Sequence, residues 1–246
     1  MTNRIALVTG GTGGIGTEIC IALANSGCKV AASWLSGVDD GEAWQAKQKE
    51  LGFDFAIAEG DVSNFDAATK MVQEAEEKLG PIDILVNCAG ITKDGFMHKM
   101  TAEQWNAVLR VNLDSVFNVT KQVITGMRDR KFGRIINLSS VNGQKGQIGQ
   151  ANYSAAKAGM HGFTMALAQE SARKGITVNT ISPGYINTSM VAAMGEKVVQ
   201  QMVNQIPVGR LGNPDEIARV VTFLAAEESG FITGANVAIN GGMYMG

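Results

Sequence analysis

The sequence has few cysteines, no excess of charge of either sign and no long apolar run. Three cysteines in 246 residues are too few for a disulfide framework, and each lies in an apolar stretch, which indicates reduced core residues. The 21 basic and 23 acidic residues give a net charge of −2, which excludes an electrostatic grip on nucleic acid or acidic membrane as the main role. No apolar run approaches the roughly 18 residues of a membrane span, and the start, MTNRIALVTGG, does not read as a signal peptide. We therefore expect a cytoplasmic protein without nucleic-acid or membrane partners.

Apolar strands and helical stretches alternate along the chain. The strands are expected at about 3–9, 28–34, 53–58, 82–86, 133–138, 176–181 and 235–239. Between them lie helical patterns, one of which opens with a capping box formed by Thr101 and Gln104. Such alternation predicts βαβ units and a parallel sheet. We predict a single Rossmann-like, doubly wound α/β domain over 1–246, with a seven-stranded parallel sheet and helices on both faces.

The domain is expected to have a cofactor half at about 1–135 and a catalytic and substrate half at about 136–246. The most irregular stretch, 184–212, follows the sixth strand, and glycines, prolines and methionines break its pattern. Because it lies at the carboxyl edge of the sheet, where ligands bind in such folds, we expect it to be a lid over the substrate.

A glycine-rich loop follows the first strand and opens the first helix; it reads Thr9-Gly10-Gly11-Thr12-Gly13-Gly14-Ile15-Gly16. Such a loop brings backbone N–H groups and a helix N-terminus close to a pyrophosphate. The second strand ends without the acidic residue that binds the adenosine ribose, and no Lys or Arg stands between Lys29 and Lys47 to hold a 2′-phosphate. Asp39 and Asp40 would repel such a phosphate. The loop predicts a dinucleotide and leaves NAD and NADP open.

Tyr153 and Lys157 stand four residues apart on an expected helix, so both side chains share one face. Free tyrosine, with a pKa near ~10, is a poor proton donor at pH 7, and a cation one turn away lowers that pKa. Ser140 lies thirteen residues before Tyr153, where the fifth strand ends at the ligand-binding edge of the sheet. The three residues predict proton transfer to a substrate oxygen that a hydroxyl group orients.

The chain resembles the classical short-chain dehydrogenases/reductases over essentially its whole length. The matching motifs are the glycine-rich loop, Asp61 after the third strand, Asn87-Cys88-Ala89-Gly90, Asn112, the Ser140–Tyr153–Lys157 set and Pro183-Gly184. Cys88 stands where the family has a second asparagine. The resemblance implies cofactor binding by Thr9, Gly10, Gly14, Ile15, Gly16, Asp61, Val62, Asn87, Ala89, Gly90, Tyr153, Lys157, Pro183, Gly184, Ile186 and Thr188.

The resemblance also implies catalysis by Asn112, Ser140, Tyr153 and Lys157, without a metal. Tyr153 would protonate a carbonyl oxygen that Ser140 binds. Lys157 would bind the ribose hydroxyls and lower the pKa of Tyr153, and Asn112 would hold a water that relays protons to Lys157. The cofactor would be NADPH, slightly favoured by family habit, or NADH.

Within the family, the chain is most similar to the reductases of acetoacetyl-CoA in polyhydroxybutyrate synthesis, at Ser139–Gln147, His161–Thr164 and Asn240–Gly246. This implies reduction of a short 3-oxoacyl-CoA to the (R)-3-hydroxyacyl-CoA by a homotetramer. Ser140, Gln147, Ile148, Gln150, Tyr153 and Tyr185 are expected to bind the substrate, with Ile148, Tyr185 and Met190 filling the far side of a short pocket.

Two other functions stay open. A 3-oxoacyl-[acyl carrier protein] reductase has similar size and motifs. The alternatives for the charges at Arg128, Arg130, Lys131, Arg173 and Lys174 are a basic patch for an acidic carrier protein or CoA phosphates and, as is more common for such charges, a solvated face. A redox sensor that binds a dinucleotide without chemistry would keep the fold but normally lose the tyrosine or the lysine.

Overall fold

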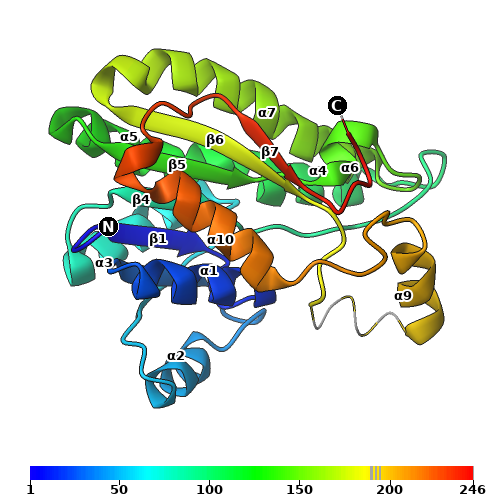
Figure 1. Cartoon of the computed structure of the whole chain (residues 1–246), viewed down its shortest axis with the longest axis horizontal. Helices are drawn as coiled ribbons and strands as arrows, with labels where there is room; N and C mark the ends of the chain where they lie inside the picture. Colours follow the sequence, from blue (N-terminus) through cyan, green and yellow to red (C-terminus); the bar gives the residue numbers. More distant parts are fainter. Residues whose placement is uncertain (189–190, 192, 194, 246) are drawn as a thin grey trace.

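In the computed structural model of the chain, seven strands form one sheet in the order β3-β2-β1-β4-β5-β6-β7 (Figure 1). The structure describes residues 1–188, 191, 193 and 195–245. The strands are β1 (Ile5–Thr9), β2 (Lys29–Trp34), β3 (Ala56–Glu59), β4 (Ile84–Asn87), β5 (Gly133–Leu138), β6 (Ile176–Pro183) and β7 (Asn236–Ile239). Every pair of neighbouring strands is parallel, which confirms the predicted doubly wound α/β fold.

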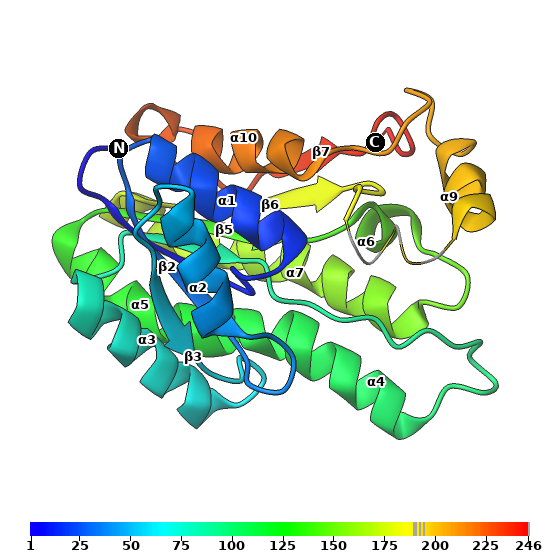
Figure 2. The same cartoon turned by 90° about the horizontal axis from the view of Figure 1, so that it is seen from below.

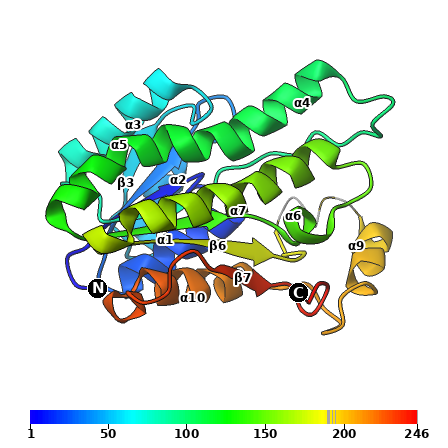
Figure 3. The ribbon, with the colours of Figure 1, turned by 90° about the horizontal axis from the view of Figure 1, so that it is seen from above.

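Helices cover both faces of the sheet (Figure 2 and Figure 3). They are α1 (Gly14–Asn25), α2 (Gly41–Glu50), α3 (Phe65–Leu79), α4 (Ala102–Leu109), η1 (Arg110–Asp114), α5 (Ser115–Arg130), α6 (Val141–Lys145), α7 (Ala151–Ser171), η2 (Ala172–Lys174), α9 (Glu196–Val203), α10 (Pro214–Ala225) and η3 (Glu227–Ser229). α1 and α10 pack together on one face, and α3, α5 and α7 lie on the other. Within the described ranges, no helix combines the length and apolarity needed to cross a bilayer.

Strand β1 lies inside the sheet, between β2 and β4, and all of its residues are buried. Ala6 and Val8 belong to the core cluster beneath α1 and α10, whereas Ile5 and Leu7 belong to the cluster beneath α3 and α5. Because successive side chains of a strand point to opposite faces, a strand buried on both faces lacks the alternation of apolar and polar residues seen in a half-exposed strand. The near-continuous apolar run Ile5–Val8 is therefore typical of an inner strand of a parallel sheet.

The loops after β1 and β4 leave the sheet in opposite directions. The chain runs from β1 outward to β2 and β3, then returns to β4 on the other side of β1. Thr9 and Asn87, the last residues of β1 and β4, are partners in register. In open parallel sheets, ligands bind outside the carboxyl ends of the strands at such a switch point. The fold thus places the glycine-rich loop and the end of β4 at one expected ligand site.

Two elements differ in detail from the sequence prediction. β3 begins at Ala56, later than the strand expected at 53–58, and Phe53 and Phe55 instead stack on each other, with Phe55 also against Trp44 of α2. The capping box at the start of α4 is confirmed, with N···O distances of 2.9 and 3.2 Å. The long helix behind it is interrupted by η1, a π-helical turn that the residue pattern did not reveal.

The segment 184–212 is held at both of its ends. Gly212 N–H donates to the carbonyl of Tyr185 at 3.0 Å, and Asn187 N–H donates to the carbonyl of Gly212 at 2.8 Å. Between these bonds, α9 stands beyond the carboxyl edge of the sheet (Figure 1). That the segment forms a lid over a substrate stays a prediction.

Candidate active site

Ser140 follows β5 at the carboxyl edge of the sheet. Its Oγ accepts a hydrogen bond from Asn142 N–H at 3.1 Å and so caps the short helix α6. The residue is only 8% exposed. Because the cap uses an oxygen lone pair, the hydroxyl hydrogen is left to donate to another oxygen.

Helix α7 carries Tyr153 and Lys157 one turn apart. The buried Lys157 donates from Nζ to the carbonyl of Leu138, the last residue of β5, at 2.6 Å. The same Nζ lies 5.6 Å from the centre of the Tyr153 ring. Ser139 ties α7 to β5 further, because its Oγ donates to the Lys157 carbonyl at 2.8 Å. The end of β5 and the start of α7 therefore bring Ser140, Tyr153 and Lys157 to one place.

Burial dominates the electrostatics of this group. Removal of the Lys157 ammonium from water lowers its pKa from 10.5 to about 8. Burial raises the pKa of Tyr153, the hydrogen bond with Ser140 opposes this, and the negative charge of Asp94 adds to it. In this structure the net shift of the Tyr153 pKa is upward, because burial outweighs the opposing hydrogen bond, and the predicted lowering by Lys157 stays a prediction. A tyrosine that holds its proton at pH 7 is nevertheless in the state that a proton donor needs.

Asn112 lies in the π-helical turn η1, the kind of irregularity that often marks a functional site. Its Nδ2 donates to two backbone carbonyls at 2.9 Å each, one of them that of Ile91, and its Oδ1 accepts from Ile91 N–H at 3.2 Å. A Cβ on Gly90 would lie 2.6 Å from this Oδ1 and 3.5 Å from Lys157 Nζ, so glycine alone leaves the two groups room. Since both amide hydrogens are in use, a relay water beside Lys157 would have to donate to a carbonyl oxygen of this turn.

The loop after β1 and the first turn of α1 leave little or no space for a Cβ at Gly10, Gly11 and Gly16. Gly10 has a φ of +61°, and a Cβ there would lie 3.1 Å from the Ala89 backbone. A Cβ on Gly16 would overlap the Gly10 carbonyl oxygen. Among the described residues, no side chain caps α1, and its first residue, Gly14, faces Thr188 of the loop after β6. The uncapped N–H groups and this close approach fit the pyrophosphate of a dinucleotide.

Thr9 and Asn87 end strands β1 and β4, and their side chains bind the protein itself. Thr9 Oγ1 accepts from the backbone N–H groups of Cys88 and Ala89 at 3.0 and 3.1 Å. Asn87 Nδ2 donates to Asn137 Oδ1 on β5 at 2.8 Å. Both side chains fix the loop after β4, so any contact of this loop with a cofactor would be made by its backbone.

The remaining predicted cofactor residues follow β3 and β6. Asp61 Oδ1 accepts from Ser63 N–H at 2.9 Å, and the carbonyl of Val62 accepts from Asn118 Nδ2 at 3.0 Å. At the end of β6 and directly after it lie Pro183, Gly184, Ile186 and Thr188. These two groups extend the edge marked by the glycine-rich loop in both directions across the sheet.

Known proteins match the chain over nearly its whole length. The model of the family described as short chain dehydrogenase matches residues 4–199. The chain belongs to the short-chain dehydrogenase family. It is 60% identical to an acetoacetyl-CoA reductase of Allochromatium vinosum over 98% of this chain and 99% of that protein. It is 56% identical to an acetoacetyl-CoA reductase of Cupriavidus necator over 100% of both chains, and 42% identical to a 3-oxoacyl-[acyl-carrier-protein] reductase of Vibrio cholerae over 100% and 99%. This short-chain dehydrogenase is therefore an oxidoreductase that uses a nicotinamide dinucleotide.

The predicted substrate residues of this short-chain dehydrogenase fall into an inner and an outer group. Gln150 is the inner one: its Oε1 accepts from Asn142 Nδ2 and its Nε2 donates to Asp94 Oδ2, each at 2.9 Å. Gln147 binds a lysine of its own loop at 3.1 Å, and Ile148 is 82% exposed. Because its side chain is largely exposed, a place for Ile148 at the far side of a short pocket stays a prediction.

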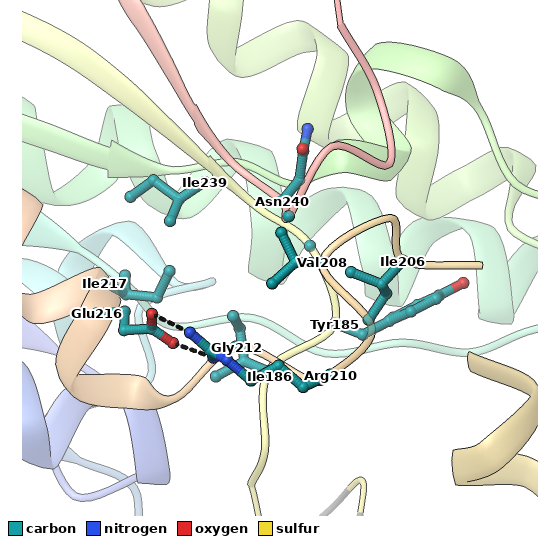
Figure 4. A pocket seen from close by; sticks show the side chains of 12 residues that line it. Tyr185, Ile186, Ile206, Val208, Arg210, Gly212, Glu216, Ile217, Ile239 and Asn240 are labelled. Carbon is teal, nitrogen blue, oxygen red and sulfur yellow. Dashed lines mark hydrogen bonds and ion pairs between the residues drawn. The ribbon is translucent and has the colours of Figure 1, made fainter. Parts of the chain in front are cut away.

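Tyr185 lines a cavity of about 110 Å³ next to the loop after β6 (Figure 4). Its walls are largely apolar, with Ile206, Val208 and Ile239 among them, and the ion pair of Arg210 and Glu216 lies at its side. The described lining includes none of the three catalytic candidates on β5 and α7. A role for Tyr185 at the acyl end of the substrate stays a prediction, and Met190 lies outside the described residues.

Three polar residues beside the site were not predicted. Asn142 donates to Ser140 Oγ from its backbone N–H and to Gln150 Oε1 from its side chain, and Asp94 Oδ2 accepts from Gln150 Nε2. His161 Nε2 lies 2.8 Å from Ser139 Oγ, and burial lowers the pKa of this histidine. Only His161 had a visible signal, since it stands one turn after Lys157 on the same helix.

The basic patch considered for CoA phosphates lies at the opposite end of the sheet. Its members, Arg128, Arg130, Lys131, Arg173 and Lys174, precede the first residues of β5 and β6, whereas the catalytic candidates follow the last residues of β5. A strand of this length spans about 20 Å. The patch therefore lies away from the catalytic candidates, and its use by a carrier protein or by CoA phosphates stays a prediction.

Proposed function

We propose that this chain reduces a short 3-oxoacyl-CoA, above all acetoacetyl-CoA, to the (R)-3-hydroxyacyl-CoA. The main support is the meeting of Ser140, Tyr153 and Lys157 at the carboxyl edge of the sheet, beside a loop that fits a dinucleotide. The fold names no substrate by itself. The thioester is supported by two relatives named acetoacetyl-CoA reductase, at 60% and 56% identity, and the (R) configuration rests on the resemblance.

The nicotinamide dinucleotide, when bound, supplies a hydride to the 3-oxo carbon of the substrate. Tyr153 donates its phenolic proton to the carbonyl oxygen, which takes up the electron pair of the C=O bond. Ser140 Oγ donates a hydrogen bond to the same oxygen and stabilises the negative charge that develops there. The phenolate left on Tyr153 is stabilised by the positive charge of Lys157, whose Nζ lies 5.6 Å from the centre of the ring.

Lys157 and Asn112 have supporting roles in this proposal. A pKa of about 8 lets Lys157 exchange protons near neutral pH, so it can return a proton to Tyr153 while it binds the ribose hydroxyls. A water on a carbonyl oxygen of the turn around Asn112 connects Lys157 to solvent. The other cofactor residues, on the loops after β1, β3, β4 and β6, hold the dinucleotide through backbone groups and Asp61.

The second candidate substrate is a 3-oxoacyl thioester of acyl carrier protein. The reductase of Vibrio cholerae that carries this name is 42% identical, against 56% and 60% for the proteins named for acetoacetyl-CoA. A sensor without chemistry is a weaker candidate, because it would have no use for a buried lysine one turn from a tyrosine.

The choice between NADPH and NADH depends on the loop after β2. The resemblance slightly favours NADPH, whereas the residues between Lys29 and Lys47 include no cation for a 2′-phosphate. Asp40 accepts from Ala43 N–H at 2.9 Å and thereby holds its negative charge at the start of α2. These opposed features favour a modest preference for one cofactor, with both accepted.

A homotetramer is proposed because large apolar side chains stand exposed on helices that can pair. Phe65 and Phe117 stack on each other at the surface of α3 and α5, and Trp105 is half-exposed on α4. Phe231 and Met245 are almost fully exposed and would form a second contact. Light scattering at micromolar concentration tests this, and a monomer of 26.0 kDa would contradict it. The free cysteines fit a reducing, cytoplasmic compartment.

Initial rates with acetoacetyl-CoA and with acetoacetyl-carrier protein, each with NADH and NADPH, test the proposed function. We expect acetoacetyl-CoA and 3-oxovaleryl-CoA to be good substrates. 3-Oxooctanoyl-CoA should be poor, because each methylene that a short pocket cannot hold costs about 1–3 kcal/mol. Reduction of only long-chain or carrier-bound substrates would contradict the proposal. A cofactor ratio of kcat/KM above about 10³, or ~4 kcal/mol, would contradict the modest preference.

A further inference from the structure

A chain of hydrogen bonds leads from the substrate-binding hydroxyl to an acidic side chain. Ser140 Oγ accepts from Asn142 N–H at 3.1 Å, and Asn142 Nδ2 donates to Gln150 Oε1 at 2.9 Å. Gln150 Nε2 then donates to Asp94 Oδ2 at 2.9 Å. The Asp94 carboxylate is thus connected to Ser140 through the amides of Asn142 and Gln150.

The backbone holds Asp94 in the same place. The next residue, Gly95, donates its N–H to the carbonyl of Gly149 at 2.8 Å, which joins the loop after β4 to the loop between α6 and α7. Asp94 lies close enough to Tyr153 for its charge to raise the pKa of the phenol. The carboxylate therefore acts electrostatically on the point where the substrate carbonyl must lie.

The charge of Asp94 is not neutralised by contact with a base. Lys93 and Lys99 belong to the same loop, and Lys145 of the facing loop donates to Gln147 Oε1 at 3.1 Å. None of the salt bridges among the described residues includes Asp94. Asp94 is itself exposed, as are its neighbours Phe96, Met97 and Ile148, so its charge acts from the solvent-facing rim of the site and is open to screening by salt.

We propose that Asp94 makes this site select uncharged 3-oxo thioesters and esters and reject free 3-oxo acids. The inference rests on the proposed function, because it concerns the group two carbons away from the carbonyl that is reduced. With that carbonyl at Ser140 and Tyr153, a free acid would bring its carboxylate toward Asp94, and two like charges at short range repel. The carbonyl of a thioester carries no charge and can instead accept a hydrogen bond from the Gln150 amide.

The test compares two small substrates that share the acetoacetyl group and lack the CoA phosphates. These are acetoacetyl-N-acetylcysteamine, an uncharged thioester, and acetoacetate, the free acid. For the wild-type enzyme we expect kcat/KM at least about hundredfold higher for the thioester. Asp94→Asn keeps an oxygen that can accept from Gln150 but removes the charge, and should lower this ratio about tenfold through a gain with acetoacetate.

Two control variants separate charge from position. Asp94→Glu keeps the charge and should keep the preference for the thioester. Asp66→Asn removes an exposed carboxylate from the first turn of α3, far from the site, and should leave the ratio as in the wild type. An unchanged ratio in Asp94→Asn, or an equal fall in Asp94→Glu, would overturn the inference.

A measurement on the wild type alone covers the case in which Asp94→Asn does not fold. Salt screens repulsion between exposed charges, so a rise in KCl from about 0.05 to 0.5 M should raise kcat/KM for acetoacetate about twofold relative to the thioester. No such rise would overturn the inference in that case. Equal use of acetoacetate and thioester by the wild type would overturn it while the proposed function stands. Failure to reduce any acetoacetyl thioester would overturn both.

Discussion

The cofactor side and the substrate side of the carboxyl edge are held in place by different kinds of contact. On the cofactor side, buried side chains of β1 and β4 fix the loops, and glycines let backbone approach backbone with no space for a Cβ. On the substrate side, the loop 141–150 is held by bonds between long polar side chains, and Ile148 is 82% exposed. The cofactor side is therefore specified by backbone geometry, whereas the substrate side is specified by a few side-chain contacts that single substitutions can change.

The largest effect should come from the residue where the two sides meet. Tyr153→Phe keeps the ring and removes the proton, so we expect turnover to fall at least about 10²-fold, the lower range for general acid catalysis. Dinucleotide affinity, measured by fluorescence titration, should change little. Ile148→Ala on the exposed rim should stay within about threefold of wild-type turnover. Near-normal turnover of Tyr153→Phe would refute the assigned role.

The rigidity of the cofactor side can be tested with one added methyl group. Gly16→Ala forces a Cβ against the Gly10 carbonyl oxygen, and overpacking of this kind costs about 1–3 kcal/mol of unfolding free energy. Gly162→Ala is the matched control, because its Cβ on helix α7 meets no atom within 4 Å, and it should stabilise by up to about 1 kcal/mol. Urea unfolding measures both. Equal stability of the two variants would show that the backbone of the glycine-rich loop can shift to accommodate a Cβ at Gly16.

The buried lysine makes stability depend on pH. Its folded pKa of about 8 lies below the ordinary value of 10.5, so between these pH values the unfolded chain binds the extra proton. The unfolding free energy of the wild type should therefore rise from pH 8 to about 10.5, and the burial penalty is fully present below pH 8. Lys157→Met removes that penalty and the bond to Leu138 together, so we expect a net gain of about 1 kcal/mol at pH 7 and a flatter profile.

Urea unfolding of Lys157→Met at pH 7 and pH 10 checks this expectation. Lys174→Met is the control, since Lys174 is exposed and its loss should leave the pH profile as it is. Turnover of Lys157→Met should fall even though the chain becomes more stable. A loss of stability at pH 7 would mean that the bond to Leu138 outweighs the burial of the charge.

The smallest expected effect lies on the substrate side. Gln150→Ala should raise the KM for acetoacetyl-CoA about fivefold, or ~1 kcal/mol, and lower kcat less, if Gln150 binds ground and transition states alike. Gln147→Ala should change KM less, because the amide of Gln147 is bound to a lysine of its own loop. A larger effect at Gln147 than at Gln150 would reverse the inner and outer assignment.

The sequence predicts those features that depend on spacing along the chain. Strands β1 and β4 are buried at every position and stand out as mostly apolar runs, whereas the edge strands β3 and β7 are only partly buried. Tyr153 and Lys157 share a helix face at a fixed spacing. The bond between Asp94 and Gln150 joins residues 56 positions apart, and no local pattern reports such a contact. The raised pKa of Tyr153 could not be predicted from the sequence either, because it depends on how deeply the side chain is buried in the folded chain.

The π-helical turn η1 fixes the number of residues that the chain needs between α4 and α5. One extra residue in a helix rotates everything after it by about 100°, so α4 and α5 are out of phase with each other. Deletion of a single residue from Arg110–Asp114 would give a straight helix of good propensity, yet it would turn either α4 away from α7 or α5 away from α3 and the sheet. Insertions and deletions should therefore be far less tolerated here than in the segment 184–212, whatever residues are added or removed.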